Sequence, residues 1–438
     1  MLDAINILMY IFGGILLVLF LFLLFTGIII AISFFKKQKF PKYEPPVSVV
    51  IPAYNEEKNI KKCIDHVLKS NYPKNLYDIT VVDDGSTDNT RKIVSKYRNV
   101  RILRLGHKGK TAALNYGIMH ARSDIVLTID ADTMLEKDAL SKIVRPFSDP
   151  KVGASIGTYL VANRQNLLTA FQVIEYSYNS LIRMAFSKVF SDSVWFYGAM
   201  SCYRKSALKK VGYMHSDTLT EDMDISLRLQ NNGYKIIHVH DAYSDTIVPH
   251  TIRGLFKQRI RWWTGVLQSM KKNKKESYNR VFHKGKHSKN SKSKSGAAEN
   301  TSSIPVVFIY LNQWWWSAFS LICIPMYAIQ VLYWLPFNLA TFMDTFMYLF
   351  RWFSVFGPLY SIYMLPQWGV NFYSIFGISA GIISVTFITL SLTIFKNRLG
   401  LLEVLAIVFY FPYTLLMNVI MMVSVVRYLW HKPKGFVK

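Results

Sequence analysis

The run Ile125-Val-Leu-Thr-Ile129, followed at once by Asp130-Ala-Asp132, decides how the middle of this chain folds. Consecutive apolar and β-branched residues predict a buried strand, and the carboxylates come directly after it. Three similar short runs precede it, at residues 47–51, 79–82 and 100–105. The segments between these runs read as helices. Strands that alternate with helices predict an α/β domain with a mostly parallel sheet and right-handed crossovers.

Acidic side chains follow the ends of these strands. Asp83 comes after the second strand, and Asp130 and Asp132 come after the fourth. Ligands of parallel sheets bind outside the carboxyl ends of the strands, so this topology would gather the carboxylates on one edge. Two carboxylates at positions i and i+2 could converge on one divalent ion that also binds phosphate, and Mg²⁺ or Mn²⁺ suits such ligands. The alternative is that these residues only fill turns.

Three turns hold candidates for contacts with a nucleotide. Tyr54 could stack on a base, although Asn55 and Glu56 also suit a helix start, as a cap and a first-turn acid. Asp83 could accept hydrogen bonds from a base or ribose, or it could form an Asp-Gly turn. The stretch Gly106-His-Lys-Gly-Lys110 precedes a helix. Such a position favours phosphate, and the alternative is an exposed basic turn.

Two further motifs lie closer to the C-terminus. Thr220-Glu-Asp222 precedes a helical run, where Asp222 could be a general base that takes the proton of a hydroxyl. The same residues also suit a helix cap and the helix dipole. Gln258, Arg261 and Trp262 are spaced so that they share one helix face. Arg261 could bind a diphosphate and Trp262 could stack on a sugar ring, whereas the alternative is an amphipathic interfacial helix.

Charge and cysteine content exclude some classes of protein. The 438 residues carry a formal net charge of +25. Many of the cations flank apolar segments, as the positive-inside bias expects, and no stacking or groove-reading motif accompanies them. Nucleic acid is therefore not expected as a partner. Cys63, Cys202 and Cys323 are far apart, which argues against a zinc site or a disulfide framework and fits a reducing cytoplasmic face.

Apolar segments flank the α/β region on both sides. Residues 5–34 are almost entirely apolar and long enough to cross a bilayer. The lysines that follow predict a cytoplasmic position for the next domain; they are Lys36, Lys37, Lys39 and Lys42. Later candidate spans bring the expected number to five, at residues 306–335, 337–364, 371–395 and 401–428. Asp344 and Arg351, in the second of these, either face a polar cavity or lie near the membrane surface.

The sequence thus predicts a multi-pass protein of the cell membrane in four parts. They are an N-terminal anchor at 1–35, a cytoplasmic α/β domain at 46–268, a basic loop at 271–303 and transmembrane or interfacial helices at 304–430. The basic loop is rich in Lys, Ser, Asn and His and cannot bury a core, so we expect it to be flexible. Its cations either contact anionic lipid or are simply solvated.

The ordered motifs of residues 46–268 resemble family 2 glycosyltransferases with a GT-A fold. The similarity is to the processive membrane-embedded group, which includes cellulose, hyaluronan and poly-N-acetylglucosamine synthases. The motifs are PAYNE at 52–56, VVDDGS at 81–86, GKTAALN at 109–115, DAD at 130–132, FYGAMSCYR at 196–204, TED at 220–222 and QRIRW at 258–262. Residues 165–178 and 251–258 look most like bacterial poly-β-1,6-N-acetylglucosamine synthases. The basic insertion after Trp262 and the tryptophan triplet at 314–316 depart from that pattern.

The resemblance implies a role for each matching residue. The nucleotide would be held by Tyr54, Glu56, Asp83 and Lys110. The diphosphate would contact Asp130, and the metal would bind Asp132. The acceptor pocket would be shaped by Gly198 and Ala199. The catalytic residues would be Asp222, as the base, and its neighbour Glu221. The diphosphate and the acceptor would also be held by Gln258, Arg261 and Trp262.

The implied activity is an inverting, metal-dependent transfer of N-acetylglucosamine or a related hexose from a UDP-sugar to a growing polysaccharide, processive and coupled to export. The implied partners are the UDP-sugar, a glycan or lipid-linked acceptor, membrane lipid and accessory export subunits. One alternative is a non-processive transferase that acts on a membrane lipid. Another is a multi-span transporter whose cytoplasmic domain only binds nucleotide. The complete set of carboxylates argues against the transporter, since nucleotide binding does not need Asp222.

Overall fold

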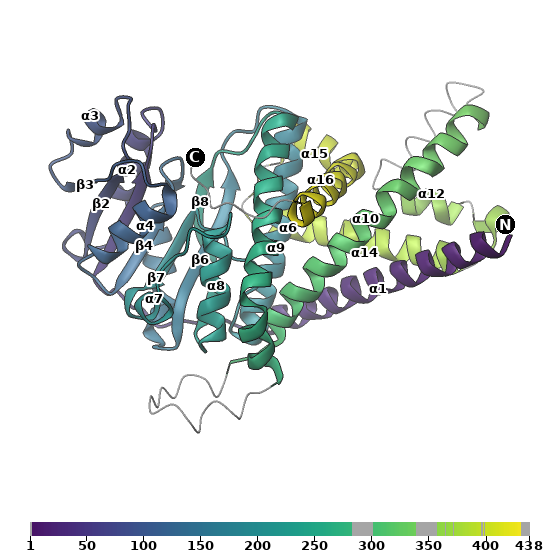
Figure 1. Ribbon diagram of the computed structural model, residues 1–438, viewed down its shortest axis with the longest axis horizontal. Helices are drawn as coiled ribbons and strands as arrows, with labels where there is room; N and C mark the ends of the chain where they lie inside the picture. The colour runs from purple at the N-terminus through teal and green to yellow at the C-terminus, as the bar shows by residue number, and fades with distance from the viewer. Residues whose placement is uncertain are drawn as a thin grey trace.

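A mixed parallel and antiparallel sheet, covered by helices, forms one half of the molecule, and long helices extend from this half on the other side (Figure 1). The computed structural model describes residues 2–282, 301–338, 357–363, 365–370, 372–395, 397 and 399–430. The strands lie in the order β3-β2-β1-β4-β7-β6-β8-β5. Their bounds are β1 Val47–Ala53, β2 Tyr77–Asp83, β3 Val100–Arg104, β4 Ile125–Ile129, β5 Met134–Leu135, β6 Val152–Val161, β7 Met200–Arg204 and β8 Lys235–Thr246.

Helices pack on both faces of the sheet because side chains alternate along each strand. In β1, Val49 and Ile51 join the core under α2 and α5, whereas Val50 joins the core under α4, α7 and α8. The helices of this half are α2 Ile60–Leu68, α3 Thr90–Val94, α4 Lys110–Met119, α5 Ala139–Ile143, α6 Leu167–Phe190, α7 Lys205–Val211, α8 Glu221–Asn231 and α9 Ile252–Phe282. Short 3₁₀ turns lie at Lys74–Leu76 and Arg145–Ser148.

The sheet is less uniformly parallel than the sequence predicts. Strands β3, β2, β1 and β4 are parallel, as expected. Strand β7 is antiparallel to both of its neighbours, β4 and β6. Helix α6 leads the chain away from the carboxyl edge of the sheet, and residues 191–199 bring it back to that edge. Strand β7 therefore begins there and runs in the direction opposite to β4. Because Met200 pairs with Ile129, the residues before β7 lie beside the end of β4.

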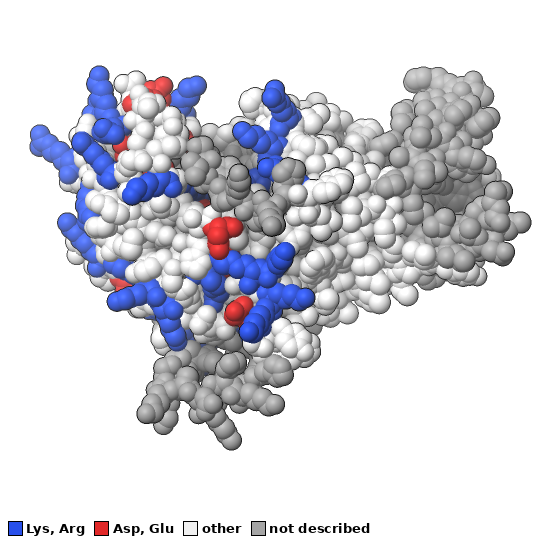
Figure 2. Space-filling view, in the orientation of Figure 1, with Lys and Arg blue, Asp and Glu red and all other residues white. Residues whose placement is uncertain are grey.

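Apolar helices form the extension that leaves the α/β half (Figure 1). They are α1 Leu2–Phe35, α10 Ile304–Asn338, α12 Gly357–Tyr363, α13 Leu365–Trp368, α14 Phe372–Ile394, α15 Leu401–Val408 and α16 Tyr410–Trp430. Two described segments, Gly13–Phe35 and Tyr410–Trp430, are long and apolar enough to cross a membrane, which is fewer than the five spans expected. On the face shown in Figure 2, Lys and Arg lie over the α/β half, and the described surface of the extension shows neither charge.

The candidate span at 401–428 is interrupted in the structure, and its membrane-length helix begins only at Tyr410. Helix α15 ends at Val408, and α16 begins at Tyr410. Proline has no amide hydrogen and its ring clashes with the carbonyl four residues earlier, so Pro412 is incompatible with an uninterrupted helix. The span expected at 337–364 falls largely on residues 339–356 and 364, which lie outside the described residues, as do Asp344 and Arg351.

The flexible loop expected at 271–303 is wrong for its first part, because α9 continues to Phe282. Asn273 is buried and donates to Asp224 Oδ1 on α8 over 2.8 Å. Tyr310 of α10 donates its hydroxyl to Ser277 Oγ over 3.2 Å and to the Met270 carbonyl over 2.8 Å. Polar contacts with α8 and α10, rather than an apolar core, therefore stabilise this end of α9. Residues 283–300 of the expected loop lie outside the described residues.

The close packing of α4 on the sheet predicts the effect of one substitution. A Cβ at Gly117 would lie 2.4 Å from Val50 Cγ1 and 2.9 Å from Val82 Cγ2. Gly117→Ala should therefore destabilise the fold by about 1–3 kcal/mol, which outweighs the gain of about 1 kcal/mol in helix propensity. We expect a lower midpoint in thermal unfolding. Gly106→Ala is the control, since its Cβ meets nothing within 4 Å. Equal midpoints for the two variants would contradict this packing argument.

Candidate active site

Lys110 lies among the carboxylates at the carboxyl edge of the sheet. It opens α4, and its Nζ is 2.6 Å from Asp130 Oδ1 and 3.8 Å from Glu221 Oε1. Asp130 follows β4 and Glu221 opens α8, so three separate segments meet here. Burial works against the charged ammonium, but Asp130 and Glu221 together raise the pKa of Lys110 above its ordinary value. The side chain is therefore a fixed cation at neutral pH.

Asp132 carries negative charge that Lys110 does not fully neutralise. Burial first, and then the charges of Asp130 and Glu56, raise the pKa of the Asp132 carboxyl to about 6. Burial and the neighbouring acids both disfavour the ionised form, which a nearby cation would stabilise. A divalent cation would supply this stabilisation, and carboxylate, water and phosphate oxygens are the ligands that Mg²⁺ prefers. Asp130 and Asp132 thus fit the metal that the sequence predicts.

Asp222 has the position and environment of a base. Its Oδ2 accepts from the Gly198 amide over 2.8 Å, and its Oδ1 accepts from the Met223 amide over 2.7 Å. Burial, followed by the charge of Glu221, raises the pKa of the Asp222 carboxyl to about 7. A Cβ on Gly198 would lie 3.2 Å from Asp222 Oδ2, so glycine allows this close approach. Thr220 precedes α8 without a side-chain cap bond, contrary to the capping interpretation of this motif.

The segment between α6 and β7 also contacts the carboxyl edge of the sheet, through a backbone hydrogen bond. The Ala199 carbonyl accepts from the Asp130 amide over 3.0 Å. Gly198 and Ala199 therefore connect Asp222 with the end of β4. The antiparallel course of β7 produces this connection, because it starts the strand beside Asp130.

The candidates for nucleotide contacts lie after β1 and β2. Asp83 Oδ2 accepts from Arg91 Nη2 over 2.7 Å and from its Nε over 2.9 Å, so a protein cation already occupies one of its oxygens. The Tyr54 ring stacks on His107, with centroids 4.2 Å apart and planes at 27°. Glu56 Oε2 accepts from Asn59 Nδ2 over 3.0 Å.

Two features of this region were not found from the sequence. Helix α2 begins at Ile60, so Asn55 and Glu56 do not start it and the helix-cap interpretation is wrong. Asp84 accepts from the amides of Lys108 and Gly109 over 2.7 and 2.8 Å, which holds the loop before α4 against β2. The left-handed φ of +89° at Gly109 is the local signal of this tight loop.

On α9, Trp262 packs among aromatic and cationic groups. Its ring stacks with Tyr197, with centroids 6.2 Å apart and planes at 22°. The Arg259 guanidinium lies over the indole, 4.2 Å from the centroid. Gln258 accepts from Arg259 Nη1 through its side-chain oxygen, so it contacts a neighbouring cation. The positive charge of Arg261 acts on Asp222 and lowers its pKa, against the larger effects of burial and Glu221.

One cavity of about 920 Å³ joins most of these residues. The predicted site residues that line it are Lys110, Asp130, Asp132, Gly198, Ala199, Glu221, Asp222, Gln258, Arg261 and Trp262. Its other end lies between the apolar helices, where Phe22 of α1, Trp316 of α10 and Met417 of α16 contribute to the lining. Tyr54, Glu56 and Asp83 are not part of this lining.

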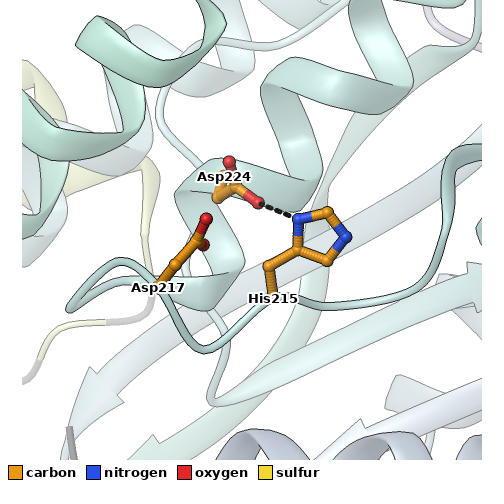
Figure 3. A group of neighbouring side chains, drawn as sticks. All are labelled: His215, Asp217 and Asp224. Carbon is orange, nitrogen blue, oxygen red and sulfur yellow. Dashed lines mark ion pairs between the residues drawn. The ribbon is translucent and has the colours of Figure 1, made fainter. Parts of the chain in front are cut away.

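A second acidic cluster has a different character. His215, Asp217 and Asp224 place ligand atoms within 4.8 Å of one another, on and before α8 (Figure 3). The Lys272 Nζ contacts all three, at 2.9 Å from His215 Nδ1, 2.7 Å from Asp217 Oδ1 and 3.1 Å from Asp224 Oδ2. An ammonium group thus already occupies the position that a metal ion would need. We interpret this cluster as the anchor of α9 on α8.

The α/β region is similar to proteins of a known family. Residues 48–212 match the model of glycosyl transferase family 2. Poly-beta-1,6-N-acetyl-D-glucosamine synthases of Staphylococcus aureus (strain COL) and Staphylococcus epidermidis are 34% identical to this chain over 226 and 225 residues. Each match covers 50% of this chain and 54% of the relative, so the chain spans about half the length of these curated relatives.

A solved structure has a similar fold. The mannosyltransferase PcManGT from Pyrobaculum calidifontis, in complex with GDP-Man and Mn²⁺, superimposes with a TM-score of 0.57 at 19% identity. The similarity covers 96% of this chain and 99% of that one. The two proteins therefore share their fold, including the helical extension.

The environment of Asp222 predicts how it titrates. Asp222 should keep its proton until the pH rises to about 7, because burial and Glu221 disfavour its ionised form. In pH-difference infrared spectra, a protonated carboxyl band should disappear near this pH in the wild type and be missing in Asp222→Asn. Asp132→Asn should remove a separate band that titrates near pH 6. A band near pH 7 that persists in Asp222→Asn would contradict the assignment.

Proposed function

We propose that this chain, which carries a glycosyl transferase family 2 domain over residues 48–212, transfers a hexose or N-acetylhexosamine from a UDP-sugar to an acceptor hydroxyl. The observation that carries the proposal is the cavity at the carboxyl edge. It brings two candidate metal ligands, Asp130 and Asp132, together with a fixed cation and a carboxylate poised to act as a base. The names of the relatives favour N-acetylglucosamine as the sugar.

The donor end of the cavity offers charges for a diphosphate. Lys110 and Arg261 are the cations that would bind phosphate oxygens and stabilise the negative charge of the leaving diphosphate. Asp130 and Asp132 would hold Mg²⁺ or Mn²⁺, and the bound metal would act as a Lewis acid toward the leaving group. Tyr54 would stack on the base. The Tyr54 and His107 rings are in contact, so they have to separate, or to present an outer face, when a base binds.

Asp222 would start the reaction by taking the proton of the acceptor hydroxyl. The acceptor oxygen then bonds to the anomeric carbon as the bond from that carbon to the diphosphate oxygen breaks. The proton stays on Asp222, and the electron pair leaves with UDP. Attack opposite the leaving group inverts the configuration at the anomeric carbon. Gly198 holds the carboxylate in place through its amide, and Trp262 would offer a surface on which the acceptor sugar stacks.

The acceptor is proposed to be a growing glycan, extended processively and exported. The lining of the cavity supports a place for it, since the cavity continues past Trp262 between α10 and α16. A second candidate is a lipid-linked acceptor, which the apolar side chains of α1 and α16 in the same lining favour. Both candidates require membrane. We propose that Gly13–Phe35 and Tyr410–Trp430 cross the bilayer as part of a multi-pass region, with the catalytic domain on the cytoplasmic side.

The test is a transfer reaction with membranes that contain the full chain. A panel of radiolabelled nucleotide sugars is supplied, and the products are sized. Label from a UDP-sugar in a long polymer supports the glycan acceptor, whereas a labelled lipid monosaccharide supports the second candidate. Absence of transfer from every sugar, with intact donor binding, would refute the proposed activity.

The role of Asp222 predicts a specific loss. Asp222→Asn keeps the size of the side chain but removes its basicity, so turnover should fall by about 10²-fold or more, with donor binding within a few-fold of wild type. The wild-type rate should rise as the pH rises through about 7, because the carboxyl must lose its proton before it can act as the base. An unchanged rate in Asp222→Asn would leave Asp222 only as the first-turn acid of α8.

The metal proposal predicts a contrast between the two acidic clusters. In the presence of UDP, wild-type protein should bind Mn²⁺, measured as loss of the free-ion signal in electron paramagnetic resonance. Asp132→Ala should abolish this binding without changing the unfolding midpoint, because the residue lies at a strand end. His215→Ala should retain it, since Lys272 occupies that cluster. Binding that survives Asp132→Ala but is lost in His215→Ala would reverse the assignment.

A further inference from the structure

We propose that Glu175, in the middle of α6, is a positioning residue of the acceptor site. It holds Arg259 against the indole of Trp262, and it ties this pair to α16 through Tyr413. The inference rests on the proposed function, in which Trp262 is the surface for the acceptor sugar. Glu175 lies in the stretch 165–178 but is not one of the candidate site residues, and the proposal assigns it to the acceptor step.

Arg259 forms a buried ion pair with Glu175. Its side chain is fully buried, with 0% exposure. Its Nη2 donates to Glu175 Oε2 over 2.8 Å and its Nε donates to Oε1 over 3.2 Å, so the two planar groups meet edge to edge. A buried guanidinium without a carboxylate would lose its hydration without compensation. Glu175 therefore determines where Arg259 lies and the plane in which its guanidinium is held.

Arg259 in turn restricts Trp262. The guanidinium carbon lies over the indole, 4.2 Å from its centroid, within the range of a cation–π contact. Arg259 and Tyr197 thereby cover part of the indole, so a sugar has to contact what remains of the ring. Gln258 accepts from Arg259 Nη1, which fixes the guanidinium on a further side. Rotation of the indole would break these contacts, so the ring is held in one orientation before a sugar arrives.

A second support lies behind Tyr197, the other ring that stacks on Trp262. The guanidinium of Arg183 is fully buried and lies over Tyr197, 4.3 Å from its centroid. The four side chains form a series of cation, ring, ring and cation. Its two ends differ, because Arg259 has a carboxylate partner and Arg183 bonds to Ser180 Oγ. Glu175 is thus the carboxylate that neutralises the Arg259 end of this series.

Glu175 also connects the series to the apolar helices. Tyr413, near the start of α16, donates its hydroxyl to Glu175 Oε2. The Tyr413 ring stacks on Phe171 of α6, with centroids 5.2 Å apart and planes at 23°. One carboxylate is therefore shared by α6, α9 and α16. A movement of α16 would reach Trp262 through three successive contacts, from Tyr413 to Glu175 and Arg259 and then to the indole, which couples the acceptor surface to the helical region.

Loss of this anchor should impair the acceptor step and spare the donor step. A misplacement of the acceptor by about 1 Å can reduce the rate by about 10²-fold. Glu175→Gln keeps the volume of the side chain but removes the charge that holds Arg259. We expect transfer to acceptor to fall at least tenfold. UDP-sugar affinity and hydrolysis of the donor by water should stay within about twofold of wild type, since Lys110, Asp130 and Asp222 are untouched.

The experiment compares four full-length variants in membranes or detergent. They are Glu175→Gln, Tyr413→Phe, Trp262→Ala as the reference phenotype, and Asp192→Asn as the matched control. Asp192 forms another buried ion pair with α9, to Arg280 at 3.4 Å, at the far end of that helix. Transfer, donor hydrolysis, donor affinity and unfolding midpoint are measured for each. Hydroxyl-radical footprinting, read by fragment ions that separate Trp262 from the adjacent Trp263, reports the exposure of Trp262 and needs no acceptor.

A lower ratio of transfer to hydrolysis in Glu175→Gln, with a smaller decrease in Tyr413→Phe and a wild-type ratio in Asp192→Asn, supports the proposal. Greater oxidation of Trp262 in Glu175→Gln supports it as well. A wild-type ratio and unchanged oxidation in Glu175→Gln would overturn it, and so would an equal change in Asp192→Asn. If the wild type makes no glycosylated product, the proposed function fails. The footprint of Trp262 still decides whether Glu175 positions it.

Discussion

Repulsion among like charges at the carboxyl edge is the constraint on which the site depends. Asp130, Asp132, Glu221 and Asp222 line one cavity, and Lys110 is the cation in direct contact with two of them. Partly buried carboxylates either keep their protons or need counter-charge. The raised pKa values of Asp132 and Asp222 express this requirement. A site of this kind favours a cation near Asp132 and gives the Asp222 carboxyl a pKa near neutral pH.

The course of the chain through the sheet makes that crowding possible. Parallel strands alone would deliver the acids that follow β2 and β4. The reversed strand β7 adds a backbone amide, at Gly198, which bonds to the side chain that opens α8. This amide partly offsets the unfavourable burial of Asp222, and the missing Cβ of Gly198 keeps the approach open. The second half of the sheet therefore completes a site that the first half only begins.

Helix α9 joins this site to the apolar helices. Its N-terminal part carries Gln258, Arg261 and Trp262 into the cavity. Its C-terminal part is anchored on α8 by Lys272, which neutralises Asp217 and Asp224. Between these ends, Tyr310 of α10 donates to the Met270 carbonyl. These contacts along α9 keep Trp262, Asp222 and the helical extension in a defined relation.

The sequence by itself determined the parallel strands β1 to β4, the acids that follow them and the shared face of Gln258, Arg261 and Trp262, because strand alternation and helical spacing are local properties. It did not reveal Glu175, whose partners Arg259 and Tyr413 lie 84 and 238 positions away. It also missed the reversal of β7 and the helical course of residues 271–282. Only the tertiary structure decided these features and the acidities of Asp132 and Asp222, since burial and counter-charge depend on which distant segments meet.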